Sequence, residues 1–205
     1  MIRNRLNELM KIKKIRVKDL NEQLGISRAT LVKIRENTAT QMRYDTINKL
    51  CKYLNVTLDD FFEYIPMDIS ICSSTPPYEV EKIKEANKSP NNFTALGFID
   101  SQLTISVNST QYHYYVGDCE YMPDTLFYIS FISSYNLALE AGIEEKYPDA
   151  LPTDELVKDW KSLPDGFKTM LEKRLYDNVR QSYKLSKTCK LIIAIDFLED
   201  LEDEE

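Results

Sequence analysis

Along the first third of the chain, apolar residues recur every three or four positions, which is the spacing of amphipathic helices. This pattern predicts five short helices within residues 1–66. They cover about Ile2–Ile12, Val17–Leu24, Arg28–Glu36, Tyr44–Asn55 and a short segment that starts after Thr57. The residues expected in their core are Ile2, Leu6, Leu9, Met10, Val17, Leu20, Leu24, Ile26, Leu31, Ile34, Tyr44, Ile47, Leu50, Cys51, Leu54, Leu58, Phe61 and Phe62. We therefore predict an all-α, five-helix domain at the N-terminus.

A sharp turn is expected between the second and third of these helices. Gly25 follows the second helix directly, and glycine readily takes the left-handed conformation that ends a helix. Ser27 then precedes the third helix, where its hydroxyl can accept from free first-turn amides. With Leu31 and Ile34 facing inward, the outward positions of the third helix are Arg28, Ala29, Thr30, Val32, Lys33 and Arg35. A short helix presented in this way fits the major groove of B-DNA.

These offsets resemble those of the lambda-repressor-like (Cro/CI, XRE) helix-turn-helix family. The matching positions are Leu20, Leu24-Gly25-Ile26-Ser27, Thr30-Leu31, Ile34, Asn37, Thr46-Ile47, Leu50-Cys51, Leu54-Asn55-Val56 and Asp59 to Pro66. The resemblance covers about a third of the chain and implies a helix-turn-helix DNA-binding domain. Asn21 departs from the pattern, because the family usually has alanine there to let the two helices approach. Asn21 either loosens that contact or forms a hydrogen bond across it.

The resemblance also implies which side chains contact DNA. The positions that fall where the family reads bases are Arg28, Ala29, Thr30 and Lys33. Arginine and lysine donate to guanine O6 and N7, and an alanine methyl meets a thymine methyl. The positions expected to hold phosphates, and thereby to set the register on the duplex, are Arg16, Lys18, Ser27, Arg35, Asn37, Thr38, Thr40 and Arg43.

Beyond residue 66 the helical pattern gives way to turns and alternation. The Ser/Thr/Pro stretch Cys72–Pro77 is typical of a linker, and weak alternation over Tyr78–Ala86 favours an edge strand. Residues 87–92 are predicted to form a loop. We therefore interpret 67–92 as a linker with an edge strand.

The remaining segment, 93–205, is predicted to fold as an α+β domain with an antiparallel sheet. Leu103, Ile105 and Val107 alternate with polar residues, and a turn at Asn108–Thr110 leads into a second alternating run that completes a hairpin. The later expected elements are a strand through Phe127–Phe131, either a further strand or a helix over 134–141, helices at Asp154–Trp160 and Asp165–Leu185, a strand at Leu191–Phe197 and an acidic tail at Leu198–Glu205. Tyrosine suits half-exposed contact surfaces, so Tyr115 and Tyr121 are our candidates for an interface, with packing of the sheet as the alternative.

Charge separates the two parts of the chain. Residues 1–66 carry 13 Lys/Arg against 8 Asp/Glu, a net charge of +5. Residues 67–205 carry 13 Lys/Arg against 25 Asp/Glu, a net charge of −12. A basic N-terminal domain suits phosphate, whereas an acidic remainder does not.

Several classes of function lack their signatures in this sequence. None of the four cysteines is spaced as C-x-x-C, and the chain has one histidine, His113, so we expect neither a metal site nor a cofactor. No acid and nucleophile accompany His113 at useful spacing, and we expect a non-enzyme. No apolar run approaches the roughly 20 residues of a membrane span, and no secretory core is evident. A soluble cytoplasmic protein is expected.

Three functions remain open at this stage. The leading hypothesis is a sequence-specific transcriptional repressor of the phage or mobile-element type that regulates its own gene. It would bind a palindromic operator in double-stranded DNA as a homodimer formed through the C-terminal domain. The alternative is an anti-CRISPR protein whose acidic C-terminal domain inhibits a nuclease, with a helix-turn-helix domain that represses its own promoter. A third is an antitoxin whose second domain binds a toxin protein.

Overall fold

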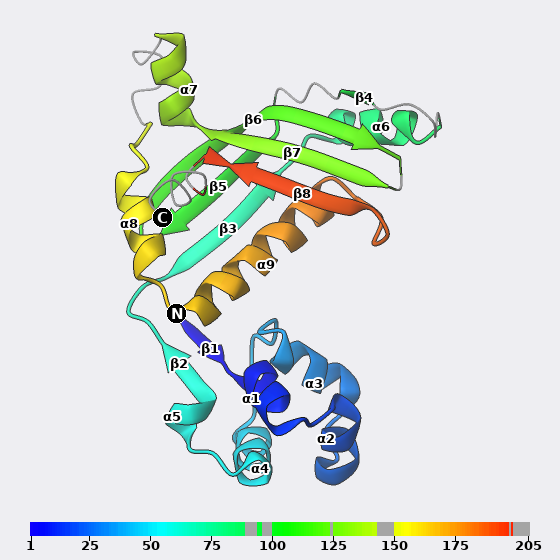
Figure 1. The fold of residues 1–205 in the computed structure, drawn as a ribbon, viewed down its shortest axis with the longest axis vertical. Helices are drawn as coiled ribbons and strands as arrows, with labels where there is room; N and C mark the ends of the chain where they lie inside the picture. The colour runs from blue at the N-terminus through cyan, green and yellow to red at the C-terminus, as the bar shows by residue number, and fades with distance from the viewer. Residues whose placement is uncertain (89–93, 96–99, 124, 143–149, 197, 199–205) are drawn as a thin grey trace. The chain divides into compact units, whose positions relative to one another are not determined.

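The chain folds as two separate units, Met1–Met67 and Asp68–Glu205 (Figure 1). The structure is a computed structural model, and it describes residues 1–88, 94–95, 100–123, 125–142, 150–196 and 198. None of the helices in these described segments is long and apolar enough to cross a membrane. Each unit has its own core and is described by itself below.

The N-terminal unit contains five helices and a two-stranded antiparallel sheet. In chain order its elements are β1 (Ile2–Asn4), α1 (Leu6–Lys13), α2 (Val17–Leu24), α3 (Arg28–Arg35), α4 (Tyr44–Leu54), α5 (Leu58–Phe61) and β2 (Phe62–Tyr64). The core consists of Leu6, Leu9, Met10, Leu20, Ile26, Leu31, Ile34, Leu50, Leu54 and Phe61. The five predicted helices are therefore present, but the unit is not all-α.

The start of the chain corrects the predicted first helix. Ile2–Asn4 forms strand β1 and pairs with β2, so that Ile2 lies opposite Tyr64. Ile2, which was expected in the core, is 64% exposed, whereas Arg3 is 6% exposed. Helical spacing of apolar residues cannot reveal a strand partner that lies some 60 positions away, and the pairing energy of that partner decides the local structure here.

Two further residues that were expected in the core are exposed. Tyr44 is 87% exposed and Leu58 is 58% exposed. Each is the first residue of its helix, α4 and α5 respectively, so its side chain extends beyond the end of the packed face. Asn21 forms a hydrogen bond, which was one of the two expected alternatives. Its side-chain Nδ2 donates to the carbonyl of Ile26 in the turn at 2.8 Å.

The C-terminal unit is built on a curled mixed sheet with strand order β3-β5-β6-β7-β8, and β4 pairs with β6 (Figure 1). The strands are β3 (Ile69–Ser74), β4 (Thr94–Ala95), β5 (Gln102–Val107), β6 (Thr110–Met122), β7 (Leu126–Ser133) and β8 (Lys190–Ile195). The helices are α6 (Pro77–Ala86), α7 (Ser134–Ala141), α8 (Asp154–Ser162) and α9 (Asp165–Ser182). Helix α9 contacts both edge strands, β3 and β8.

The predicted hairpin and the long late helix are both confirmed. Strands β5 and β6 pair antiparallel around Asn108, which has a left-handed backbone. The residues spaced by four along α9 and just after it are all buried: Phe167, Leu171, Leu175, Val179 and Tyr183. Of the two interpretations of residues 134–141, the helix is correct. The loop predicted over 87–92 and the acidic tail predicted over 198–205 lie largely outside the described residues.

The prediction of a purely antiparallel sheet was wrong, because β8 runs parallel to β7, with Leu126 opposite Lys190. Between these strands the chain passes through α7, α8 and α9 and returns to the end of the sheet at which β7 began. Alternation of apolar and polar residues identifies a strand but carries no information about its direction. Helices between two neighbouring strands are the connection that parallel pairing requires.

The prediction of a linker and edge strand over 67–92 also needs correction. Ile69–Ser74 forms β3, which pairs antiparallel with β5, and residues 77–86 form helix α6. Pro77 is the first residue of α6, a position where proline is tolerated because a backbone N–H there has no acceptor within the helix. The helix buries Glu79, Val80 and Ile83. The Glu79 carboxylate accepts bonds from the Asp100 amide at 3.0 Å and the Ser101 hydroxyl at 2.5 Å, so the segment belongs to the second unit.

Candidate nucleic-acid interface

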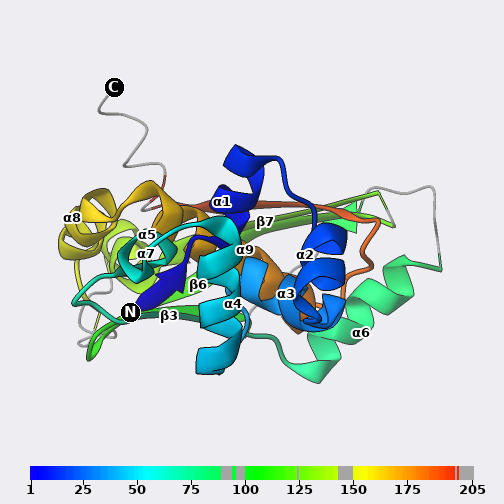
Figure 2. The ribbon, with the colours of Figure 1, turned by 90° about the horizontal axis from the view of Figure 1, so that it is seen from below.

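Helix α3 is held at its amino end by the turn that the sequence predicts. Gly25 has a φ of 66°, in the left-handed region, and ends α2. Ser27 then caps α3, with its Oγ accepting from the Thr30 amide at 3.2 Å. Leu31 and Ile34 anchor the inner face and are at most 1% exposed. Helices α2 and α3 pack against each other (Figure 2).

The outer face of α3 carries the side chains expected to read bases. Arg28, Ala29, Thr30 and Lys33 are all exposed. Among the described residues no carboxylate pairs with Arg28 or Lys33, whereas Arg35 lies 2.9 Å from Glu36. Two cations on this face are therefore available for an external acceptor.

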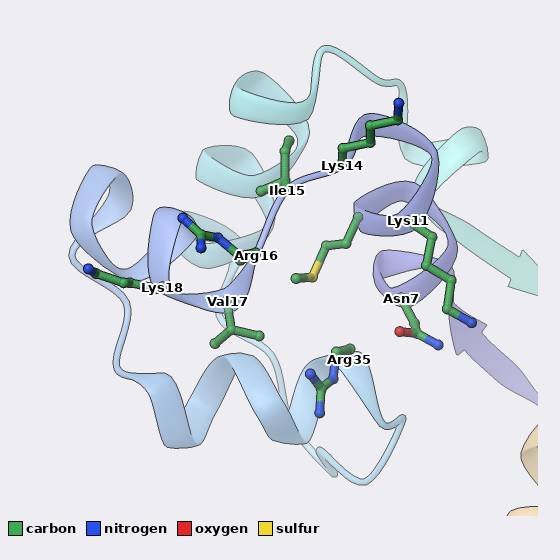
Figure 3. A pocket seen from close by; sticks show the side chains of 9 residues that line it. Asn7, Lys11, Lys14, Ile15, Arg16, Val17, Lys18 and Arg35 are labelled. Atoms are coloured by element: carbon green, nitrogen blue, oxygen red, sulfur yellow. The ribbon is translucent and has the colours of Figure 1, made fainter.

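An open basic groove of about 580 Å³ lies beside this helix (Figure 3). It is lined by Asn7, Met10, Lys11, Lys14, Ile15, Arg16, Val17, Lys18 and Arg35. As Figure 3 shows, these side chains come from α1, from the connection to α2 and its first residues, and from the carboxyl end of α3. We call this feature the basic groove. Its apolar members, Met10, Ile15 and Val17, are at least half-buried, and its lysines are exposed.

Electrostatics favour an anion in the basic groove. Of its five cations, three lie near acids: Arg16 is 3.4 Å from Asp19, Lys18 is 3.7 Å from Glu22, and Arg35 is 2.9 Å from Glu36. No ion pair of Lys11 or Lys14 occurs among the described residues. The first turn of α2 lines the groove, and the amino end of a helix carries partial positive charge.

Besides its ion pair with Arg16, Asp19 stabilises the amino end of α2. Its carboxylate accepts a 2.8 Å bond from the Arg16 amide, and this bond, with the Arg16 guanidinium, lowers the pKa of Asp19. The carboxylate therefore holds the start of α2 in place while it partly offsets the charge of Arg16.

The remaining residues expected at phosphates differ in how available they are. Thr40 and Arg43 are exposed in the connection between α3 and α4. The Ser27 hydroxyl is already used in the cap, and the Thr38 hydroxyl donates to the Lys33 carbonyl at 3.3 Å. The Asn37 side chain forms three hydrogen bonds with Asn4, two accepted by its Oδ1 and one donated by its Nδ2. The second Nδ2 hydrogen remains for another acceptor, and a phosphate contact by Asn37 stays a prediction.

Sequence reasoning did not single out Asn7, Lys11 or Lys14, which the fold brings into the basic groove. A signal was present, because Lys11, Lys13 and Lys14 form a short basic run at the end of α1. What the sequence could not supply was the position of that run, since it depends on how α1 packs beside the start of α2.

The two tyrosines proposed for an interface lie in different environments. Tyr121 is 3% exposed, stacks edge-on against Phe127 and donates a 2.5 Å bond to the Asn87 side chain. Its burial counts against an interface role and favours the alternative of sheet packing. Tyr115 is half-buried on β6, opposite Ile132 of β7.

The comparisons with known proteins identify the first unit. Residues 5–67 match the family model described as the Cro/C1-type HTH DNA-binding domain. No curated protein and no solved structure matches the chain. The family match and the geometry of α3 together assign residues 5–67 to the Cro/C1-type helix-turn-helix DNA-binding domains, and they support a DNA-binding regulator.

Proposed function

We propose that this protein is a sequence-specific transcriptional repressor of the phage or mobile-element type that acts on its own promoter. In this proposal it works by binding rather than by catalysis. The observation that carries the proposal is the exposed outer face of α3, with Arg28 and Lys33 outward, beside a groove lined by five cations. These two features match the two kinds of contact, to base edges and to phosphates, that specific DNA binding requires.

In the proposed complex α3 enters the major groove with its amino end toward the base edges. Arg28 stands at the first position of the helix and can donate two hydrogen bonds to a guanine. Lys33 lies more than one turn further along and reaches a neighbouring base. Ala29 lies beside Arg28 and offers its methyl group to a thymine.

The basic groove holds the sugar-phosphate backbone next to the major groove. Lys11, Lys14, Arg16 and Lys18 surround the amino end of α2, so a phosphate there meets both side-chain cations and backbone amides. Such contacts fix the register of α3 on the duplex without reading sequence themselves.

A single unit of this size binds weakly, so we propose that two copies bind a palindromic site. Half-sites about one helical turn apart would each receive one α3. We assign the self-association to the C-terminal unit, and analytical ultracentrifugation of the full chain tests it. A chain that stays monomeric at micromolar concentration, with and without operator, would contradict the homodimer.

The direct test starts from a duplex selected by the wild-type chain from a randomised library. Arg28→Ala and Lys33→Ala should each lower the preference for this duplex over a scrambled one by about 1–3 kcal/mol. Lys52→Ala is the matched control, because it removes one exposed cation on α4, outside the predicted contacts. If Arg28→Ala retains full preference, then α3 is not the element that reads DNA.

Repression is tested with a reporter driven by the DNA immediately upstream of the gene. Expression of the wild-type chain should lower reporter output, and Arg28→Ala should restore it. Unchanged output with the wild-type chain would leave DNA binding intact but would rule out autorepression.

A second candidate function has one observation in its favour, the net charge of −12 on residues 67–205. An acidic unit can occupy the nucleic-acid channel of an RNA-guided nuclease and so inhibit it. Adding the purified chain to such a nuclease should then stop cleavage at a one-to-one ratio. Cleavage that is unaffected at a large excess of the chain would exclude inhibition of that nuclease.

A further inference from the structure

The carboxyl end of α3 is closed by Asn37 in a left-handed conformation. Asn37 has a φ of 54°. Its amide donates to the Ile34 carbonyl at 3.0 Å, and the Thr38 amide donates to the Lys33 carbonyl at 2.9 Å. This pair of bonds is the Schellman motif, in which the left-handed residue is usually glycine and sometimes asparagine. The backbone alone therefore does not explain why asparagine stands here.

The Asn37 side chain pairs with the edge of strand β1. Its Oδ1 accepts from the Asn4 backbone amide at 2.7 Å, and its Nδ2 donates to the Asn4 carbonyl at 3.0 Å. Met1 and Ile65 exchange two backbone hydrogen bonds, N–H to C=O in both directions. In an antiparallel pair such bonds recur at every second residue, so the backbone N–H and C=O of Asn4 point away from β2. The carboxamide of Asn37 thus forms with the Asn4 backbone the two hydrogen bonds that a third strand would form.

The Asn4 side chain extends the same network into two helices. Its Nδ2 donates to the Ile34 carbonyl at 2.7 Å and to Asn37 Oδ1 at 2.8 Å, and its Oδ1 accepts from the Leu6 amide at 3.1 Å. Asn4 is 5% exposed, so water cannot readily replace a lost partner. The Asn4 side chain therefore links the start of α1, the edge of β1 and the last turn of α3.

We propose that Asn37 is a positioning residue that fixes the carboxyl end of α3 on β1 and thereby sets the orientation of its outer face. The inference rests on the proposed function, because it is the DNA contacts of α3 that need this orientation. Contacts to base edges tolerate displacements of only about half an ångström. Without the carboxamide, the carboxyl end of α3 keeps the Asn4 bond to the Ile34 carbonyl but loses its pairing with the backbone of β1. The last turn of α3 then shifts, and Lys33 moves away from its base.

This proposal differs from a phosphate contact by Asn37 in what happens to sequence preference. A neutral carboxamide releases no counterion when it contacts a phosphate, so the salt slope stays the same, but its removal weakens binding to all duplexes by the same factor. Removal of a positioning residue instead alters the ratio of affinities for preferred and scrambled duplexes.

The test uses the full chain with Asn37→Gly, which keeps the left-handed backbone and removes only the carboxamide. Asn55→Gly is the matched control, because Asn55 also ends a helix with a positive φ, of 50°, and no side-chain hydrogen bond of Asn55 occurs among the described residues. Affinities for the duplex selected by the wild-type chain and for a scrambled duplex are measured at several salt concentrations. Circular dichroism first establishes a temperature at which every variant is fully folded.

We expect Asn37→Gly to reduce the preference for the selected duplex about fivefold or more, with an unchanged salt slope. Asn55→Gly should match the wild-type chain in both quantities. Weaker binding to both duplexes by the same factor, with an unchanged preference, would make Asn37 a phosphate ligand and would overturn the proposal. So would a preference that Asn37→Gly leaves intact, since a merely stabilising residue affects unfolding but not the choice of sequence.

Hydrogen exchange separates failure of this inference from failure of the proposed function. The Asn4 amide should exchange at least about tenfold faster in Asn37→Gly, whereas the Arg5 amide, which donates to Phe61 at 2.8 Å, should keep its rate. If the wild-type chain selects no duplex, the proposed function fails while this pairing is still measured. If Asn37→Gly does not fold, Asn37→Asp keeps the acceptor oxygen and loses the donated bond. Its added negative charge weakens binding to both duplexes alike, so the ratio of the two affinities is the readout, and it should show a smaller loss of preference.

Discussion

Arg3 is a cation in the interior of a unit that the sequence predicts to be basic on its surface. Its guanidinium lies 2.5 Å from Glu8 on α1 and 2.5 Å from Glu63 on β2, and its side chain is 7% exposed. A buried charge is tolerated when partners and hydrogen bonds replace its hydration. Arg3 therefore links α1 to the two-stranded sheet, and its effect should be visible in the pH dependence of stability.

The pKa of Glu8 gives the first prediction. Burial alone raises it, but hydrogen bonds and charge from Arg3 and Arg5 outweigh burial and hold the pKa below the usual value of 4.5. Because the pKa is lower in the folded chain, the stabilisation is present above 4.5 and is lost as pH falls through the folded pKa. Glu8→Gln should therefore flatten the fall in the free energy of unfolding over this acidic window.

Urea denaturation at a series of pH values measures this effect. Glu22→Gln is the control, because Glu22 is exposed and its ion pair with Lys18 spans 3.7 Å. The control should follow the wild-type curve. A Glu8→Gln curve parallel to that of the wild-type chain would contradict the assigned role of Arg3.

Gly25 gives the second prediction at this scale. Its φ of 66° strains any side chain, yet an added Cβ would have no atom within 4 Å. Gly25→Ala should therefore lose about 1–2 kcal/mol of stability from the backbone alone. Gly25→Asn should lose less, since asparagine tolerates this conformation. Thermal unfolding of the two variants decides the matter, and equal losses would show that contacts rather than backbone conformation set the cost.

At the scale of elements, local signals predicted most of the helices and the strands β5 to β8, but they missed β1, β2, β3 and the direction of β8, and they gave helix α6 as an edge strand. The caps at Gly25 and Ser27 and the hairpin around Asn108 depend on residues within a few positions of one another. Strands β1 and β2 instead depend on each other across the whole unit, and β8 depends on β7 across residues 134–189. Distant pairing of this kind leaves no periodic trace in a single sequence.

Of the basic groove, too, only the part that local sequence patterns determine was predicted. Arg16, Lys18 and Arg35 were predicted because the helix-turn-helix pattern fixes their places. Lys11 and Lys14 were not, because their contribution arises from the packing of α1 beside α2.

The third prediction concerns these two lysines. Lys11→Ala and Lys14→Ala should each weaken binding to preferred and scrambled duplexes by the same factor, and each should reduce the salt slope by about 0.9. Fluorescence anisotropy at increasing salt measures both quantities. Lys52→Ala should leave the slope unchanged. A changed sequence preference in either groove variant would mean that the groove reads bases rather than phosphates.

At the scale of the whole molecule, two cores imply two folding units. The N-terminal core, formed by residues from Leu6 to Phe61, lies wholly within Met1–Met67. Domains with separate cores generally fold as separate units.

The fourth prediction follows from this division. A fragment of residues 1–67 should fold cooperatively and bind DNA with lower affinity than the full chain, because it lacks the self-association assigned to the second unit. Circular dichroism and ultracentrifugation of the fragment test both statements. A fragment that is unfolded in isolation, or one that binds as tightly as the full chain, would contradict the division of roles.

Because β8 pairs with β7, the sheet of the second unit can form completely only after the chain has been synthesised through β8. The helix-turn-helix unit leaves the ribosome before the second unit and, by the fourth prediction, folds without it. The apolar strand β7, with Phe127, Ile129 and Phe131, is synthesised before β8 (Lys190–Ile195). The backbone groups along one edge of β7 therefore stay unpaired until β8 has been made. Nascent chains should therefore acquire a DNA-binding surface well before the sheet is protected. A translation stop just before residue 190 would release a protein with an intact first unit and an aggregation-prone second one.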